Sequence, residues 1–263
     1  MTTIGSTAAM WGSLWSHAPR DWALSEVQQA PVYEDVLRRV GVSGRSVLDV
    51  GCGAGTFLRM CADGGAQVSG LDAAAGMLEV ARERVPDADL QLGDLQRLPY
   101  PDAVFDVVTG FTSFFFADDI VAALAEAGRV ARTGAPVVIE VFGRPEHCDL
   151  EAVKAAVGPF RPEAAGGDEP EEPYWRPGVV EELVPAAGLH VDVVFDTTTA
   201  FAYAGEAELL AAMTAAGGAG AMAGPERLDA LHAAFREALA RFRRPDGSYL
   251  LRNEWHTVIA RAA

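Results

Sequence analysis

The sequence predicts an α/β fold with one mostly parallel sheet and helices on both of its faces. Short apolar runs alternate with helical patterns from residue 46 to residue 142, which is the element order of parallel sheets. Glycines follow the first apolar run directly, as in a strand that turns sharply into a helix. The chain has 263 residues, of which 50% are hydrophobic, and no long polar tract divides it. We therefore expect one domain over residues 1–263.

Strands and helices alternate through the first half of the predicted fold. Short apolar runs bounded by turn residues indicate strands, and apolar residues that recur every three or four positions indicate helices. The expected strands are 46–50, 67–71, 89–92, 105–110 and 136–142, and the expected helices are 57–64, 74–84 and 120–131. A helix between two strands allows those strands to run parallel.

The pattern becomes less regular after residue 143. Residues 144–177 should form a loop or lid, because their second half is rich in proline, glycine and acidic residues. Residues 178–263 form the C-terminal half, with a helix at 179–187, strands at 189–195 and 254–260, and helices at 206–216 and 225–242. Helices placed before the last strand indicate an insertion at about 200–246, which we interpret as a helical lid.

The first 42 residues should form an N-terminal helical cap. Their pattern is helical and is broken at Pro31. This segment also contains Trp11 and Trp15, whose rings could line a pocket or attach the cap to the rest of the protein.

Charge and cysteine content exclude several classes of function. The chain has 21 basic and 37 acidic residues, a net charge of −16, which disfavours nucleic acid as a partner. Three cysteines without a C-x-x-C pair suggest neither a disulfide framework nor a zinc site, and scattered histidines suggest no other metal. Without a recognisable targeting signal or a long apolar stretch, we expect a cytoplasmic protein that does not bind membranes. We expect a monomer or a homodimer.

The strongest local motif is Val47-Leu-Asp-Val-Gly-Cys-Gly-Ala-Gly-Thr56. Glycines at the end of a strand permit a tight turn and a close approach of the backbone to a ligand at the helix N-terminus. Thr56 stands where a dinucleotide-binding motif would have its third glycine, which disfavours a nicotinamide or flavin enzyme.

Acidic residues at the ends of the following strands support a nucleotide site. Asp72 follows the second strand, where a carboxylate can accept hydrogen bonds from both ribose hydroxyls. Asp94 follows the third strand and can accept a hydrogen bond from an adenine amine. Asp106 begins the fourth strand, and we expect it to lie with the other two acids beside the glycine-rich loop.

Four stretches together resemble the class I S-adenosylmethionine-dependent methyltransferases, within the small-molecule group that includes quinone-biosynthesis enzymes. They are VLDVGCGAG at 47–55, GLDAAAGML at 70–78, LGDLQRLPYPDAVFDVVTGFTSFFF at 92–116 and AGRVARTGAPVVIEVFG at 127–143. The resemblance implies a Rossmann-like sheet of seven strands with an antiparallel last strand. It also makes residues 43–143 the cofactor-binding core.

The resemblance implies roles for residues in these motifs. Asp49 and the main chain of Gly51, Cys52 and Gly53 would face the methionine part of S-adenosylmethionine. Asp72 would hold the ribose, and the remaining implied cofactor residues are Ala73, Met77, Asp94, Leu95, Thr109, Gly110 and Phe111. Tyr33 in the cap is a further candidate for the cofactor carboxylate.

Candidates for the acceptor site come from the residue pattern alone. We expect aromatic residues of the cap, of the segment after the fourth strand and of the lid to contact the acceptor, namely Trp11, Trp15, Phe114, Phe115, Trp175 and Tyr203. If a general base exists, histidine is the default, in the order His17, His147 and His256. Methyl transfer from a sulfonium does not require one.

The sequence therefore predicts an S-adenosylmethionine-dependent methyltransferase of specialised, natural-product metabolism. It would act on a small-molecule acceptor and release S-adenosylhomocysteine. Two alternatives remain open: an enzyme of the same fold that binds the cofactor but catalyses a cyclisation or rearrangement, and, less favoured, an NAD(P)-dependent oxidoreductase.

Overall fold

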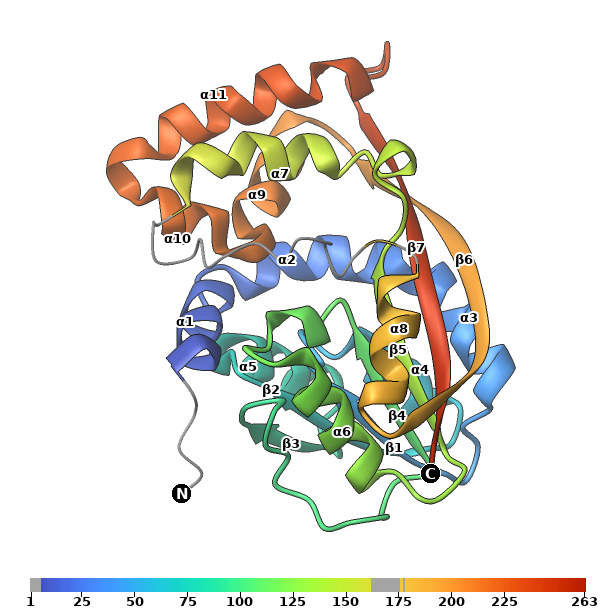
Figure 1. Ribbon diagram of the computed structural model, residues 1–263. Helices are drawn as coiled ribbons and strands as arrows, with labels where there is room; N and C mark the ends of the chain where they lie inside the picture. Colours follow the sequence, from blue (N-terminus) through green and yellow to red (C-terminus); the bar gives the residue numbers. More distant parts are fainter. Residues whose placement is uncertain (1–5, 162–175, 177) are drawn as a thin grey trace.

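A computed structural model describes residues 6–161, 176 and 178–263 of the chain. Its centre is a seven-stranded sheet with the strand order β3-β2-β1-β4-β5-β7-β6 (Figure 1). The first five strands are parallel, and β7 is antiparallel to both β5 and β6. The strands are β1 (Ser46–Val50), β2 (Gln67–Asp72), β3 (Asp89–Leu92), β4 (Val107–Phe111), β5 (Pro136–Phe142), β6 (Leu189–Tyr203) and β7 (Tyr249–Ala262). The expected fold class is confirmed.

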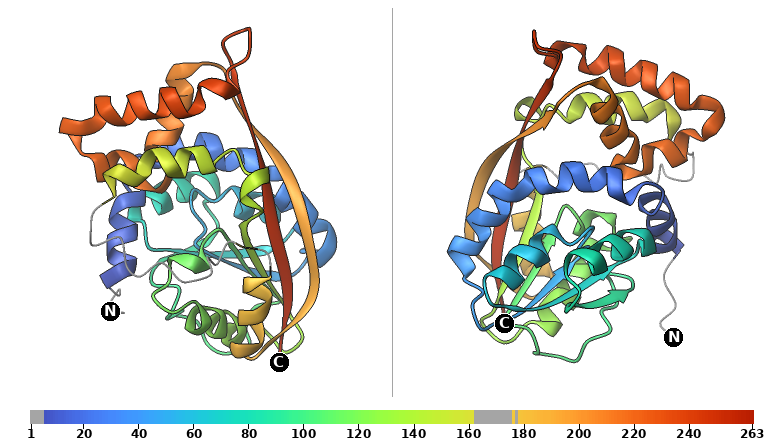
Figure 2. Two further views of the ribbon diagram at one scale, coloured as in Figure 1. Left: turned by 45° about the horizontal axis from the view of Figure 1, so that its top comes forward. Right: turned by 180° about the vertical axis from the view of Figure 1, so that it is seen from behind.

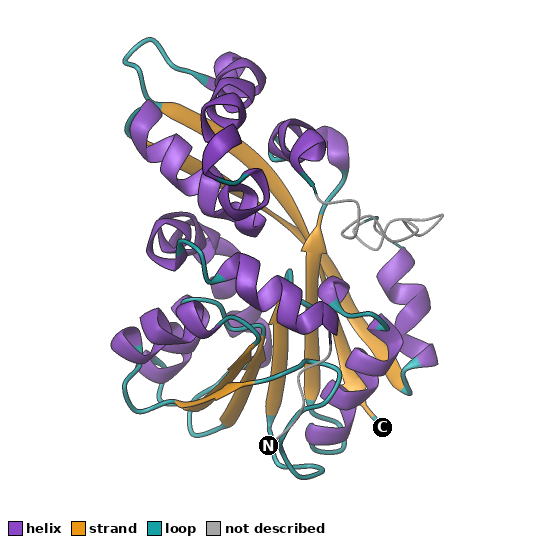
Figure 3. Cartoon of the chain, turned by 90° about the vertical axis from the view of Figure 1, so that its left-hand side faces the viewer, coloured by secondary structure: helices purple, strands orange, loops and turns teal. Residues whose placement is uncertain are grey.

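Helices cover both faces of this sheet, as Figure 3 shows. On one face α3 (Ala30–Val40) and α4 (Thr56–Asp63) pack on apolar side chains of β1, β4, β5 and β7. On the other face α6 (Ile120–Val130) and α8 (Val179–Ala186) bury the alternate residues of the same strands. Helix α5 (Ala75–Arg84) follows β2 and packs against α4.

The β6–β7 hairpin is much longer than the sequence pattern indicated. The expected strands at 189–195 and 254–260 cover only about half of β6 and β7, which continue away from the sheet (Figure 1). In the extension of β6, residues alternate between exposed and buried, with Thr197, Thr199, Phe201 and Tyr203 buried. Three successive threonines weaken the hydrophobic contrast on which the shorter prediction depended.

A helical layer lies above the carboxyl ends of the parallel strands. It consists of α9 (Glu206–Ala215), α10 (Ala219–Ala223) and α11 (Leu228–Leu239) from the insertion, together with α7 (Glu151–Val157). The insertion is therefore helical as expected, but it begins after Tyr203. Residues 144–177 were expected to be a loop or lid; within them 151–157 form the helix α7, and residues 162–175 and 177 lie outside the described residues.

The N-terminal cap runs between this helical layer and the sheet (Figure 2). It contains α1 (Ser6–Trp15), α2 (Pro19–Glu26), a short 3-10 turn at Val27–Gln29, and α3. The helical pattern is interrupted at Val27–Gln29, close to the expected break, and Pro31 lies in the first turn of the helix that follows, α3. A proline fits there, since the first helical N–H groups have no intrahelical partner. No helix in the described part of the chain is long and apolar enough to cross a membrane.

Candidate active site

Two adjoining cavities open at the carboxyl ends of β1, β2 and β4, beneath the cap. The first has a volume of about 780 Å³ including its open mouth, and the second about 360 Å³. The two cavities share Trp11, Gly51, Asp72, Ala73, Leu95 and Phe116. They therefore form one cleft at the edge of the sheet where open α/β folds bind their ligands.

The glycine-rich loop forms the floor of the cleft. Gly51, Gly53 and Gly55 all have positive φ angles, which side chains other than glycine rarely adopt. At Gly51 there is also no room for a side chain, because a Cβ atom would lie 2.4 Å from the Cβ of Ser113. The loop thus brings the backbone close to the cleft, as the motif predicted.

Two predicted carboxylates lie beside this loop. Asp72 accepts hydrogen bonds from the backbone N–H groups of Gly53 and Ala74, both at 2.8 Å. Asp49 is 3% exposed and accepts a hydrogen bond of 2.7 Å from the Thr109 hydroxyl. Burial raises the pKa of both, and the pKa of Asp49 reaches about 7 because neighbouring carboxylates add to the effect of burial.

A third carboxylate in the cleft, Glu26, was missed by the sequence analysis. Glu26 is the last residue of α2. Its two carboxylate oxygens accept hydrogen bonds from the backbone N–H groups of Ala54, at 2.9 Å, and Thr56, at 2.8 Å. Arg84 lies 3.6 Å from one of these oxygens. No local pattern marks Glu26, because only the tertiary packing of the cap brings it to the N-terminus of α4.

The second cavity is the smaller end of the cleft. Asp94 is buried there beside Leu95 and Gln96, and its Oδ1 accepts the Gln96 N–H at 2.9 Å. Asp106 is not part of this group, which corrects the expectation. It lies at the opposite edge of the sheet, where hydrogen bonds from Ser46 and Arg132 lower its pKa to about 2.

Aromatic side chains form much of the wall. The Trp11 and Phe116 rings are 4.7 Å apart, and Trp15 lies 6.1 Å from Phe116 and 5.0 Å from Trp22. At the other end of the first cavity, Tyr33 and Phe111 pack edge to face at 4.7 Å. Such walls suit an apolar ligand and can also stabilise a cation.

Most of the predicted cofactor residues meet in this cleft. Those that line it are Tyr33, Asp49, Gly51, Cys52, Gly53, Asp72, Ala73, Met77, Asp94, Leu95 and Phe111. Two predicted acceptor residues, Trp11 and Trp15, line it as well. Lining residues that the sequence did not single out as site residues include Glu26, Gln29, Phe57 and Phe116.

Other predicted site residues lie outside the cleft. Thr109 is fully buried beneath Asp49, and Gly110 packs against Phe114, which is itself in the core. Phe115 contacts Phe116 and Phe142 without lining either cavity. Tyr203 is 1% exposed and hydrogen-bonded to Ser25, away from the cleft. Trp175 lies outside the described residues.

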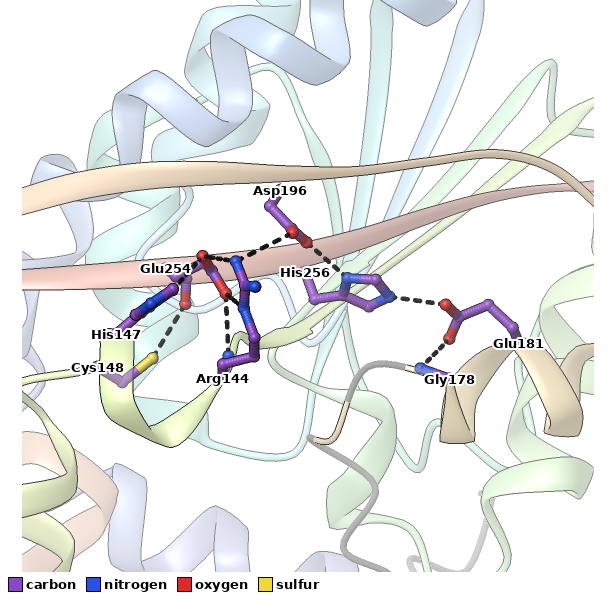
Figure 4. Close-up of polar contacts among 8 residues, drawn as sticks. All are labelled: Arg144, His147, Cys148, Gly178, Glu181, Asp196, Glu254 and His256. Atoms are coloured by element: carbon purple, nitrogen blue, oxygen red, sulfur yellow. Dashed lines mark hydrogen bonds and ion pairs between the residues drawn. The ribbon is translucent and has the colours of Figure 1, made fainter.

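The histidines proposed as bases are also elsewhere. His17 is exposed and faces α10. His147 bonds through Nδ1 to Glu254 at 2.8 Å, and His256 lies between Asp196 at 2.7 Å and Glu181 at 3.0 Å (Figure 4). None of the chain's five histidines, all within the described residues, lines either cavity. The described residues also contain no cluster of three potential metal ligands.

Comparisons with known proteins agree with this geometry. Residues 48–139 match the protein-family model described as "Methyltransferase domain". The chain carries a domain of the class I S-adenosylmethionine-dependent methyltransferase family. The resemblance expected from the sequence is confirmed.

Relatives share this methyltransferase domain but extend beyond the matched region. A malonyl-(acyl-carrier protein) O-methyltransferase of Serratia marcescens is 42% identical over 99 residues, which are 38% of this chain and 39% of that protein. A demethylmenaquinone methyltransferase of Renibacterium salmoninarum is 39% identical over 127 residues, 48% of this chain and 49% of that protein. The chain thus spans about half or less of the length of these relatives. The solved structure of the (4+2)-cyclase SpnF has a TM-score of 0.62 at 18% identity, covering 99% of this chain and 98% of that chain, and shows a shared fold.

Proposed function

We propose that the protein is an S-adenosylmethionine-dependent methyltransferase whose acceptor is an uncharged, apolar small molecule of specialised metabolism. The observation that carries this proposal is the charge of the cleft. Among the described residues three carboxylates, Glu26, Asp49 and Asp72, line the first cavity. The lysine and arginine residues of the chain are all within the described part, and none of them lines either cavity. Such a cleft attracts a sulfonium and an ammonium group, and it repels the pyrophosphate of a dinucleotide. The charge therefore supports this proposal against an NAD(P)-dependent oxidoreductase.

The residues of the cleft fit this cofactor from end to end. Asp94 and Leu95 would hold the adenine in the second cavity, and Asp72, which lines both cavities, would hold the ribose. The methionine part would then extend along the glycine-rich loop toward Asp49 and Tyr33. In total, the two cavities provide the apolar walls and the few polar groups that a nucleoside ligand requires.

The chain's own contribution to the reaction is alignment and exclusion of water. When bound, the cofactor would supply a methyl group activated by its sulfonium, because in-line attack by the acceptor on the methyl carbon releases the sulfur as a neutral thioether. Trp11 and Trp15 of α1 cover the cleft, and Gly12 between them packs directly on Ala73. The cap thereby excludes water and fixes the approach of the acceptor. With no histidine lining the cleft, the proposed mechanism uses no histidine base, and the proton that the acceptor loses on methylation passes to a carboxylate of the cleft or to solvent at its mouth.

The same charge pattern supports an uncharged acceptor. A carboxylate or phosphate group on the acceptor would find no lysine or arginine among the lining residues and would meet the three carboxylates. Flat apolar rings instead match the Trp11, Trp15 and Phe116 wall. The proposal therefore favours a quinone-type acceptor, such as the one in the name of the Renibacterium relative, over a malonyl-type acceptor.

The test is incubation with S-adenosylmethionine and matched acceptors, for instance a naphthohydroquinone and the same ring carrying a carboxylate. We expect S-adenosylhomocysteine and a product heavier by one CH₂ unit with the uncharged ring only. Preference for the carboxylated ring would refute the proposed acceptor class. A rearranged product of unchanged mass would instead identify a cyclase or isomerase of this fold.

A further inference from the structure

We propose that Glu26 binds the ammonium group of the cofactor's methionine part, so that the N-terminal cap supplies a charged ligand to the cofactor. This inference rests on the proposed function and assigns a positioning role to a residue outside the glycine-rich motif. Three observations support it: the place of Glu26 along the cleft, its free acceptor capacity, and the lack of any cation lining the cavity.

The cleft has two distinguishable ends. Asp94, Leu95 and Gln96 line the second cavity, whereas Glu26 and Gln29 line only the first. Asp72 and Gly51 line both cavities and thus lie between the two ends. If the adenine occupies the Asp94 end and the ribose lies at Asp72, the amino-acid part of the cofactor extends toward Glu26.

Glu26 retains acceptor capacity after its contacts with the protein are made. An ionised carboxylate has about four lone-pair sites; the Ala54 and Thr56 N–H groups use one on each oxygen, and the Thr56 side chain also interacts with the carboxylate. The carboxylate lies beside the glycine-rich loop, because a Cβ added to Gly53 would be 3.4 Å from Oε2, an ordinary van der Waals contact. Its partner Arg84 belongs to α5 and does not line the cavity.

The buried carboxylates at the Glu26 end of the cleft favour binding of a cation. Glu26 is 5% exposed and Asp49 is 3% exposed, so their mutual repulsion is poorly screened by water. Burial raises the pKa of Glu26, although its hydrogen bonds from Thr56 and Ala54 and the nearby Arg84 oppose the rise. An ammonium group between these carboxylates would offset the repulsion. The side-chain amide oxygen of the neighbouring Gln29 accepts a hydrogen bond of 2.6 Å from the Tyr33 hydroxyl. The N–H groups of the same side-chain amide would be donors for the cofactor carboxylate.

The cap segment that carries Glu26 also contacts the extension of β6. In the same helix, Ser25 is hydrogen-bonded to the Tyr203 hydroxyl at 2.7 Å, and Gln28 just beyond it accepts the Ala202 N–H at 2.5 Å. Helix α2 therefore contacts the glycine-rich loop on one side and the end of β6 on the other. A ligand held by Glu26 should stabilise the packing of the cap on both.

The experiment compares two ligands that differ only in the ammonium group. S-adenosylhomocysteine and its deaminated analogue, S-adenosyl-4-thiobutyrate, are titrated calorimetrically into wild-type protein and Glu26→Gln. We expect the substitution to weaken S-adenosylhomocysteine binding about 10- to 100-fold, the size of a lost charge-assisted hydrogen bond, and to leave the analogue nearly unchanged. Glu34→Gln, an exposed position of the same cap, is the matched control and should leave both affinities unchanged.

The outcomes are distinct. Equal losses for both ligands would show that Glu26 only supports the loop, and the inference would be wrong. If Glu26→Gln does not fold, Glu26→Asp is measured instead, because it keeps the charge on a shorter side chain. We expect it to prefer S-adenosylhomocysteine over the deaminated analogue, but by a smaller factor than wild type. A preference equal to that of wild type would overturn the inference. Failure of wild-type protein to bind S-adenosylhomocysteine would overturn the proposed function itself, before any variant is measured.

Discussion

Replacing Gly12 with alanine should displace α1 from the cleft. A Cβ atom at this position would lie 2.1 Å from the carbonyl oxygen of Ala73 and 2.8 Å from its carbonyl carbon. Because both atoms belong to the backbone, no side chain can move aside, and α1 must shift by about 1 Å or more. The same helix carries Trp11 and Trp15, which line the first cavity.

The expected magnitude follows from two opposing terms. Overpacking destabilises the folded state by about 1–3 kcal/mol, whereas replacing glycine with alanine within a helix stabilises it by about 1 kcal/mol. Because the added Cβ meets backbone atoms, we take the upper part of the overpacking cost, about 2–3 kcal/mol, and the net loss of about 1–2 kcal/mol would weaken S-adenosylhomocysteine binding about 5- to 30-fold. Because α1 is terminal, we expect the helix to move away from the cleft and the unfolding temperature to change little.

The assay is calorimetric titration of S-adenosylhomocysteine, with tryptophan fluorescence as a measure of the environment of Trp11 and Trp15. Gly158→Ala is the control, since that glycine is helical and has nothing within 4 Å of an added Cβ. The control should bind as wild type does. If Gly12→Ala also binds with wild-type affinity, α1 does not cover the cofactor, and the proposed role of the cap is refuted.

Three further predictions concern carboxylates. Asp72→Asn should reduce S-adenosylhomocysteine affinity about 100-fold by calorimetry, whereas Asp63→Asn, exposed on α4, should not; equal affinities would remove Asp72 from the ribose site. Burial raises the pKa of Asp49 to about 7, so the folded state binds the proton more tightly and this residue's contribution to stability falls as pH rises from about 4 to 7. Thermal unfolding of Asp49→Asn should show a smaller loss over that range, and an unchanged pH profile would contradict the assignment. Glu254→Gln should destabilise the protein by about 2 kcal/mol in denaturant unfolding, because the buried carboxylate accepts three hydrogen bonds from Arg144 and one from His147; an unchanged midpoint would show that the half-exposed Arg144 contributes nothing.

The parts of the site that could be predicted from sequence are those whose signal is local. The glycine-rich turn, Asp72 and Asp94 each follow a strand directly, so the parallel arrangement of the strands places them at one edge of the sheet. Asp106 precedes its strand and therefore lies at the opposite edge. The expectation that it joins the other acids was wrong because it disregarded strand direction.

The parts that could not be predicted depend on tertiary packing. Glu26 reaches the glycine-rich loop only because α2 crosses above it, and nothing in the sequence around Glu26 indicates that contact. The extension of β6 is stabilised by residues such as Phe201 and Tyr203 packing against the helical layer, which compensates for the weak strand pattern of the threonines. His147 and His256 resembled candidate bases only because their carboxylate partners are distant in sequence.

The central claim is that an acidic cleft under the cap holds S-adenosylmethionine and its product, S-adenosylhomocysteine. Its most direct test is calorimetric titration of the wild-type protein with S-adenosylhomocysteine and, separately, with NAD. We expect S-adenosylhomocysteine to bind at one site per chain and NAD not to bind, because its pyrophosphate would face Glu26, Asp49 and Asp72. Binding of NAD without binding of S-adenosylhomocysteine would contradict both the cofactor and the proposed reaction.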